Sequence, residues 1–260
     1  MTRLLSGVAL AAVFLAVIWF ATAPVLLAVA LAVTGLAFHE YARLVAALGV
    51  RVPWMPALAA TLAAAAMVPY PIVPVAAVLS AALIVTAVSV MTSARTGAAT
   101  LTDTAGAVLA PVYLGLPLGA LVALHQVGGR EAVLLLLATV VVSDSGQYYA
   151  GRALGRTPLA PRLSPKKTRE GAAGGFVLAP LFLVLAGPWG LPGAGPARLA
   201  LLGILVVAAG IAGDLFESMI KRAAQVKDSS SLIPGHGGVL DRIDALLFAT
   251  PVFYFFVRAL

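Results

Sequence analysis

The segment 197-ARLALLGILVVAAGIAGDLFESMIKR-222 joins a long apolar run to a cluster of polar side chains. Its apolar part is long enough for a membrane-spanning helix, which needs about 20 mostly apolar residues. Asp214, Glu217, Ser218 and Lys221 are spaced i, i+3, i+4 and i+7, so all four fall on one helical face. Because ionisable groups are costly inside a membrane, this face is a candidate functional surface.

The composition of the whole chain places it in the membrane class. Of its 260 residues, 62% are hydrophobic and 10% are charged, and the mean hydropathy is +1.04. A soluble domain is roughly 45–50% apolar and about 25% charged. The absence of cysteine excludes disulfides and thiolate chemistry. The net charge of +7 comes from basic residues between apolar runs, which orient membrane proteins, so we expect no nucleic-acid partner.

The hydropathy pattern predicts an all-α, polytopic fold with about nine transmembrane helices. The first apolar run follows Arg3 without a clear cleavage site, so we expect an uncleaved first helix. The expected spans are Leu4–Phe20, Pro24–Gly49, Pro53–Met67, Ile72–Met91, Leu101–Leu124, Glu131–Gly151, Ala172–Trp189, Ala197–Arg222 and Gly238–Ala259.

The distribution of basic residues predicts the orientation of these spans. With nine spans, 14 of the 17 Lys and Arg residues share the side of the N-terminus, and only Arg130, Arg198 and Arg258 lie opposite. Basic loops favour the cytoplasm. The N-terminus and the polar loops 152–171 and 223–237 are therefore expected there. We expect an N-terminal transmembrane region, 1–125, and a C-terminal catalytic region, 126–260.

Two helix ends carry acidic side chains that we expect to converge. Asp214 lies toward the end of one span, and Asp241 and Asp244 begin the next, with a short loop between the two helices. Carboxylates gathered in an apolar site require a metal or a basic group to compensate them, and oxygen ligands suit Mg²⁺. Glycines around His236 would let the backbone approach a phosphate. The alternative is an intramembrane salt bridge, for example between Asp214 and Lys221.

A second polar cluster surrounds the end of the sixth span. Asp144 lies deep in the apolar run, and Lys166 and Lys167 follow in a loop flanked by Gly171 and by Gly174–Gly175. A basic, glycine-flanked loop beside a buried Asp predicts a polyphosphate cradle. The alternative for the loop alone is positive-inside topology with anionic-lipid binding.

The segment 218-SMIKRAAQVKDSSSLIPGHGGVLDRID-244 resembles the hallmark motif of phosphatidate cytidylyltransferases, also called CDP-diacylglycerol synthases. The segment Ser164–Gly171 is similar to a second recurring stretch of that family, with Arg169 where an aromatic residue is expected. Asp144 stands where the family has an Asp after an apolar run. The resemblance covers roughly residues 140 to 250, and the first 100 residues share only their apolar character.

The resemblance implies transfer of the cytidylyl group of CTP to phosphatidate, giving CDP-diacylglycerol and pyrophosphate for phospholipid synthesis. It also implies a homodimer. We expect the protein in the cell inner membrane, with the active site facing the cytoplasm, where the basic loops lie. A paired-metal centre on Asp214 and Asp241 is implied, holding Mg²⁺ and a second cation such as K⁺. The phosphatidate phosphate itself would be the nucleophile.

Residue roles follow from the two motifs. Asp144 and Asp244 are further candidate metal or nucleotide ligands, and His236 would bind phosphate or brace its loop. The expected catalytic residues are Lys221, Arg222, Lys227 and Asp228, and the expected substrate-binding residues are Lys166, Lys167, Ser218, His236 and Arg242.

Two other functions remain open. A CTP-dependent polyprenol or lipid kinase would transfer the γ-phosphate and release CDP. An ion-coupled transporter would use intramembrane carboxylates but has no need of a basic, glycine-flanked loop. Away from the motifs, His39, Glu40 and Arg43 end the second span, where an interfacial polar cap is favoured over substrate contact.

Overall fold

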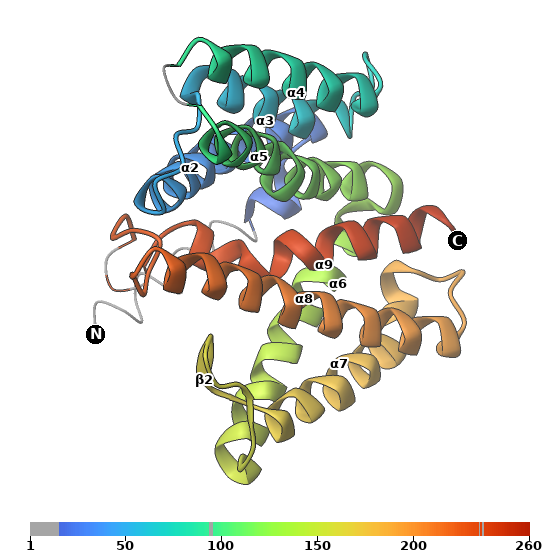
Figure 1. Ribbon diagram of the computed structural model, residues 1–260. Helices are drawn as coiled ribbons and strands as arrows, with labels where there is room; N and C mark the ends of the chain where they lie inside the picture. Colours follow the sequence, from blue (N-terminus) through green and yellow to red (C-terminus); the bar gives the residue numbers. More distant parts are fainter. Residues whose placement is uncertain (1–15, 94–95, 234, 236) are drawn as a thin grey trace. The chain divides into compact units, whose positions relative to one another are not determined.

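The computed structural model describes residues 16–93, 96–233, 235 and 237–260, and the chain is mainly helical (Figure 1). The expected first span therefore lies largely outside the described residues, although residues 16–20 are helical. The helices are α2 (Ala23–Ala47), α3 (Trp54–Met67), α4 (Val75–Met91), α5 (Ala98–Ala110), α6 (Leu116–Leu154), α7 (Arg169–Gly190), α8 (Pro196–Ala223) and α9 (Leu240–Arg258).

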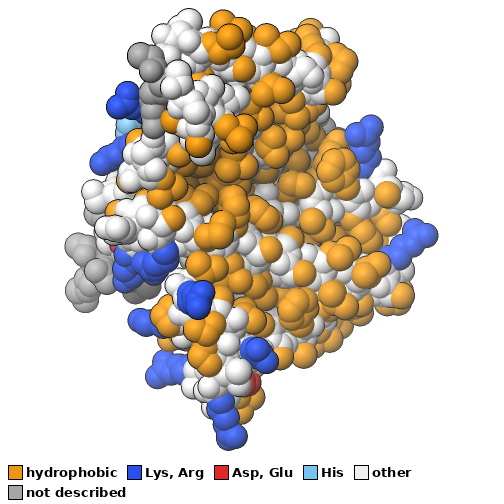
Figure 2. Space-filling model, viewed as in Figure 1, with side chains coloured by type: hydrophobic (Ala, Val, Ile, Leu, Met, Phe, Trp, Pro, Cys, Tyr) orange, Lys and Arg blue, Asp and Glu red, His pale blue; other side chains and the backbone are white. Residues whose placement is uncertain are grey.

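The helices confirm an all-α membrane protein. Among the described residues, four helical segments are long and apolar enough to cross a membrane: α2, the continuous run Ala98–Leu154, α7 and α8. Helices α3 and α4 are apolar but shorter. Hydrophobic side chains cover much of the visible surface of these helices, and Lys and Arg side chains are confined to a few places (Figure 2).

The chain divides into two compact units. Unit 1 comprises the residues up to Ala123 together with Ala223–Arg242, and unit 2 comprises Leu124–Arg222 together with Ile243–Leu260. The segment that resembles the family's hallmark motif therefore contributes to both units.

In unit 1, close backbone packing joins α3 to a π-helical turn, η1 (Pro111–Gly115), that follows α5. A Cβ atom added at Gly115 would lie 2.5 Å from the carbonyl oxygen of Thr61, and one at Gly119 would lie 2.4 Å from that of Ala65. Pro111 opens this turn, and its missing N–H favours a departure from regular α-helical bonding. Small residues thus let these helices approach one another closely.

In unit 2, helix α6 contains a non-helical residue, Gly129, with φ 71° and ψ −179°. The expected spans Leu101–Leu124 and Glu131–Gly151 lie on the two sides of this residue. The region between them, expected to be a loop, is otherwise helical. The positive φ is accessible to glycine without a Cβ penalty.

Glycines also set the packing of α6 against α7. A Cβ atom at Gly174 would lie 2.6 Å from the carbonyl oxygen of Gly146, and one at Gly175 would lie 2.9 Å from Cγ of Gln147. The interpretation of Gly174 and Gly175 as flanks of a phosphate cradle was wrong. Both residues face α6, and their lack of a side chain serves helix packing.

Helices α8 and α9 are neighbours, as the short loop between them predicted. A Cβ atom at Gly213 would lie 2.5 Å from the carbonyl oxygen of Asp244, and the rings of Phe216 and Phe248 are 5.7 Å apart.

The loop 152–171 contains a two-stranded antiparallel hairpin that the hydropathy pattern did not predict. Its strands are β1 (Pro158–Ala160) and β2 (Ser164–Thr168), with Ala160 paired to Ser164 (Figure 1). The backbone N–H groups of Arg156 and Thr157 donate to Glu170 Oε2, at 3.0 and 3.1 Å. The Thr168 hydroxyl caps α7 by accepting from the Gly171 N–H at 3.0 Å. Both contacts hold the base of the hairpin against the start of α7.

Candidate phosphate-handling site

Unit 2 contains a cavity of about 430 Å³ that brings together residues from α6, β2, α7 and α8. Its volume lies in the range of small-molecule sites, roughly 300–1,000 Å³. The lining residues are Asp144, Gln147, Tyr148, Gly151, Arg152, Lys166, Lys167, Thr168, Gly171, Ala172 and Asp214. The second polar cluster of the sequence and the aspartate of α8 therefore share one cavity.

An ion pair joins the two motif regions inside this cavity. Lys167 Nζ from β2 lies 2.5 Å from Asp214 Oδ2 on α8, and the two side chains are 24% and 33% exposed. The Ser218 hydroxyl lies 3.4 Å from Asp214 Oδ1, within the same helix. The suggested pairing of Asp214 with Lys221 was wrong, because Lys221 instead pairs with the buried carboxylate of Glu217.

Helix α6 contributes polar groups to the same cavity. Gln147 Nε2 lies 3.2 Å from Asp144 Oδ1 and 3.1 Å from the Ser143 hydroxyl. Arg152 Nη1 lies 3.3 Å from the Tyr148 hydroxyl, one turn away. The cavity thus presents carboxylates, ammonium groups and a guanidinium, which is a donor and acceptor set suited to a phosphate and its counter-cation.

Other predicted residues lie near this cavity in unit 2. The Asp244 carboxyl is within electrostatic range of Asp214, Lys167 and Lys221. Arg222 is exposed, and its Nε lies 3.4 Å from the carbonyl oxygen of Leu163 in the hairpin turn. The end of α8 therefore reaches the hairpin that carries Lys166 and Lys167.

The oxygen atoms of Asp144 and Asp214 are hard ligands that fit Mg²⁺. Among the described residues, no group of three or more acidic or histidine side chains is arranged to hold a metal ion. A metal at this cavity would therefore draw its remaining ligands from substrate phosphates and water, as Mg²⁺ commonly does.

In unit 1, a different carboxylate organises the loop between α8 and α9. Glu40 on α2 is 2% exposed. Its Oε1 accepts from the Ser230 hydroxyl at 2.6 Å and the Val239 N–H at 3.0 Å, and its Oε2 accepts from the Leu240 N–H at 2.8 Å. Glu40 thus satisfies the first amides of α9, where a negative charge is favourable. Its interpretation as part of an interfacial cap was wrong.

The Asp241 carboxylate faces the same loop. Its Oδ2 accepts from the backbone N–H groups of Ser229 and Gly238, both at 2.8 Å. The Ser229 hydroxyl lies 2.8 Å from Asp241 Oδ2 and 3.0 Å from Glu40 Oε2, and its single proton serves one of them at a time. Asp241 belongs to unit 1 and Asp214 to unit 2. A metal shared by these two aspartates stays a prediction.

The glycines of this loop have a local explanation. A Cβ atom at Gly238 would lie 2.5 Å from both carboxylate oxygens of Glu40 and 2.1 Å from the Ser229 hydroxyl. Gly237 has φ +79°, and a Cβ atom there would lie 2.7 Å from Asp241 Oδ2. Absence of a side chain thus lets the backbone approach two carboxylates.

The predicted residues Lys227, Asp228 and Arg242 are exposed, and His236 lies outside the described residues.

The whole chain, residues 1–260, matches the Cytidylyltransferase family. The chain belongs to this family. An uncharacterized protein, YnbB, of Escherichia coli is 44% identical over 131 residues, which are 50% of this chain and 44% of that protein. A phosphatidate cytidylyltransferase of Aquifex aeolicus is 42% identical over 127 residues, 49% of this chain and 47% of the relative. A phosphatidate cytidylyltransferase of Haemophilus influenzae is 47% identical over 141 residues, which are 50% of this chain and 47% of that relative. The matches thus span about half the length of these relatives.

Sequence reasoning on this cytidylyltransferase-family chain assigned no site role to four residues at the two sites. Arg152, Gln147 and Tyr148 line the cavity of unit 2, and Glu40 holds the loop of unit 1. A signal for Glu40 was present, since an acidic residue within an apolar span is a functional candidate by default. A signal for Gln147 and Tyr148 was also present, since they lie three and four residues beyond Asp144 and so share its face of α6.

Proposed function

We propose that this protein transfers the cytidylyl group of CTP to phosphatidate, giving CDP-diacylglycerol and pyrophosphate. The observation that carries the proposal is the Lys167–Asp214 pair at the cavity of unit 2, in a chain of the Cytidylyltransferase family. A cavity lined by carboxylates and by Lys166, Lys167 and Arg152 suits a triphosphate that arrives with a divalent cation.

The reaction needs no nucleophile from the protein. An oxygen of the phosphatidate phosphate attacks the α-phosphorus of CTP, and the bond to the β-phosphate oxygen breaks to release pyrophosphate. The task of the protein is to bring two anions together and offset their charge. Lys166 and Lys167 would hold the triphosphate or the lipid headgroup, and Lys221, Arg222 and Lys227 would steady the transferring and leaving phosphates.

Asp144, Asp214, Asp241 and Asp244 are the proposed metal ligands. When bound, Mg²⁺ would neutralise phosphate oxygens as a Lewis acid, with a second cation such as K⁺ beside it. Asp228 is a further candidate catalytic residue. Ser218 would orient Asp214, and His236 and Arg242 would contact phosphate.

The proposed setting is a bacterial inner membrane, with nine spans, a cytoplasmic N-terminus and an active site facing the cytoplasm. The excess of Lys and Arg on one side of the expected spans supports this orientation. The protein is proposed to act as a homodimer, as the family resemblance implies.

The deciding experiment incubates the purified full-length protein with CTP, phosphatidate and Mg²⁺. The expected products are pyrophosphate and a CDP-lipid in equal amounts. Release of CDP with a polyprenol or diacylglycerol acceptor would instead identify a lipid kinase. Absence of both products with varied acyl chains would contradict the proposal.

A further inference from the structure

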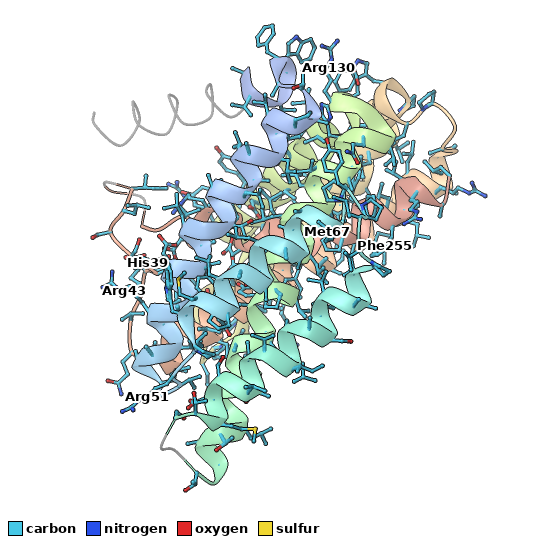
Figure 3. All side chains as sticks on the ribbon, turned by 90° about the horizontal axis from the view of Figure 1, so that it is seen from above. His39, Arg43, Arg51, Met67, Arg130 and Phe255 are labelled. Carbon is cyan, nitrogen blue, oxygen red and sulfur yellow. The ribbon has the colours of Figure 1, made fainter. Side chains whose placement is uncertain are left out.

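A second polar cavity, of about 700 Å³, lies in unit 1 at the end of α2. His39 and Arg43 reach it from α2, Arg51 from the link that follows and Trp54 from the start of α3. Figure 3 shows His39, Arg43 and Arg51 along one side of these segments. The rest of its lining is apolar or glycine: Ala42, Ala46, Gly49, Val50 and Val52.

The backbone around this cavity is held by specific contacts. Gly49, at φ +80°, follows the C-cap of α2, and the N–H of Val50 donates back to the carbonyl oxygen of Val45 at 3.1 Å. This bond satisfies a terminal helix carbonyl that would otherwise repel an anion. The N–H of Arg51 donates to Asp103 Oδ1 on α5 at 2.7 Å. This hydrogen bond fixes the backbone that carries the Arg51 side chain.

The cavity is lined by cationic side chains and by no acidic one. No Asp or Glu is among its lining residues, and the Glu40 carboxylate, one position from His39, is turned into the loop before α9. Within the part of the chain that the structure describes, the guanidinium groups of Arg43 and Arg51 form no hydrogen bond or ion pair. Two arginines facing one space are suited to bidentate binding of phosphate oxygens.

We propose that this cavity is a second anion site, which binds a phosphate group through Arg43, Arg51 and His39. The phosphate belongs either to a lipid headgroup or to a soluble phosphate compound. The lipid is favoured because Trp54 is 45% exposed and Met55 beside it is 70% exposed, as expected of side chains at a membrane interface.

The proposed site adjoins the loop that precedes α9. His39 and Arg43 also line a neighbouring cavity of about 370 Å³ in unit 1, together with Glu40, Ser230 and other residues. A phosphate held by Arg43 would therefore lie beside the hydrogen bonds that fix this loop. The site shares no lining residue with the cavity of Lys167 and Asp214, and its test requires no turnover.

Trp54 provides a local reporter of occupancy. In a Trp19→Phe/Trp189→Phe background it is the sole tryptophan. The full-length protein is reconstituted into phosphatidylcholine vesicles that contain lipids brominated on their acyl chains, carrying phosphatidate, phosphatidylglycerol or phosphatidylcholine headgroups. We expect Trp54 fluorescence to be quenched at a lower mole fraction of brominated anionic lipid than of brominated phosphatidylcholine. The preference should be about fivefold for each arginine engaged.

Paired variants distinguish lipid binding at this site from attraction of lipid by the general surface charge. Arg43→Gln/Arg51→Gln should abolish the preference, whereas Arg198→Gln/Arg258→Gln, with the same loss of net charge, should keep it. Inorganic phosphate and glycerol phosphate in solution distinguish the two sources, because their displacement of the brominated anionic lipid would assign the site to soluble phosphates. Equal quenching by all three headgroups, unchanged by either phosphate, would overturn the proposal.

A second variant keeps the test decisive if the glutamine pair does not fold. Arg43→Lys/Arg51→Lys retains both charges but loses the bidentate geometry. It should show an intermediate preference for the anionic lipids. A preference equal to that of the parent protein would show that the anionic lipids are attracted by diffuse positive charge alone, and it would overturn the proposed phosphate site.

Discussion

The carboxylates of the two units are used in opposite ways. In unit 1, Glu40 and Asp241 accept hydrogen bonds from backbone amides and serine hydroxyls of one loop. In unit 2, Asp144 and Asp214 face a cavity, and Asp214 contacts the ammonium group of Lys167. An acidic residue in an apolar chain can therefore hold the fold or handle a ligand.

The difference lies in what compensates the negative charge. Backbone amides cannot leave, so a carboxylate bound to them is a permanent part of the framework. A lysine side chain can move when a phosphate or a cation arrives, because its ammonium sits on a flexible stem. We therefore expect substitutions in unit 2 to affect turnover first, and those at Glu40 to affect stability first.

The largest expected effect is at Asp214. Asp214→Asn should lower the turnover of CTP by a factor on the order of a thousand, because it removes charge from the proposed metal and phosphate site. Pyrophosphate release measures the loss, and thermal unfolding in detergent should change little. Asp241→Asn should also abolish product formation, but with a lower unfolding temperature. Near-normal activity of either variant would contradict its proposed metal role.

The two adjacent lysines should differ. Lys167→Ala should lower kcat/KM by about 100-fold, since it removes the partner of Asp214 and a phosphate contact. Lys166→Ala, at an exposed position of the same strand, should have a smaller effect. Steady-state kinetics with varied CTP measures both. A lower KM with unchanged turnover in Lys167→Ala would argue against a substrate contact.

Glu40→Gln tests whether this carboxylate holds the loop of unit 1 in place. It replaces one acceptor oxygen by a donor facing other donors, so the protein should lose about 1–3 kcal/mol of stability. Proteolysis within residues 223–239 should become faster, and activity should fall less than in Asp214→Asn. The matched control is Glu131→Gln, which alters a half-exposed pair with Arg130. If both variants unfold at the parent temperature, Glu40 does not hold the loop.

The smallest effect on turnover is expected from a change that touches no charged group. Gly174→Ala would place a Cβ atom 2.4 Å from that of Ala150, so α6 and α7 must separate slightly. Overpacking of this kind costs about 1–3 kcal/mol. Gly35→Ala is the control, because no atom lies within 4 Å of its added Cβ. Thermal unfolding of the two variants gives the difference, and equal values would refute the close packing of α6 and α7.

Hydropathy and motif spacing predicted the apolar helices and the grouping of Asp144, Lys166 and Lys167. The spacing of the residues and the length of each apolar run suffice to predict such features, since a membrane-spanning helix satisfies its own backbone hydrogen bonds. The distribution of basic residues placed Asp214 and these residues only on the same side of the membrane. Their proximity was not predicted, because helices distant in sequence can pack in many orders.

Features that depend on long-range contacts were not predicted. The hairpin β1–β2 is held by Glu170 and Thr168 and has no hydrophobic alternation of its own. Glu40 lies 199 residues from its partner Val239, so no local pattern links them. The glycines at 174 and 175 were assigned to phosphate because their packing partners on α6 cannot be read from their neighbours in the sequence.

The hairpin gives two neighbouring lysines different positions. Lys167 meets Asp214 while Lys166 remains exposed, in the stretch of β2 where the pairing with β1 is irregular. The pairing of Ala160 with Ser164 leaves three residues in the turn. Deleting one of them would displace β2 along β1 and draw Lys167 away from Asp214. Length variation in this turn should therefore be as damaging to an evolving homologue as the loss of a catalytic side chain, although the turn itself contacts no substrate.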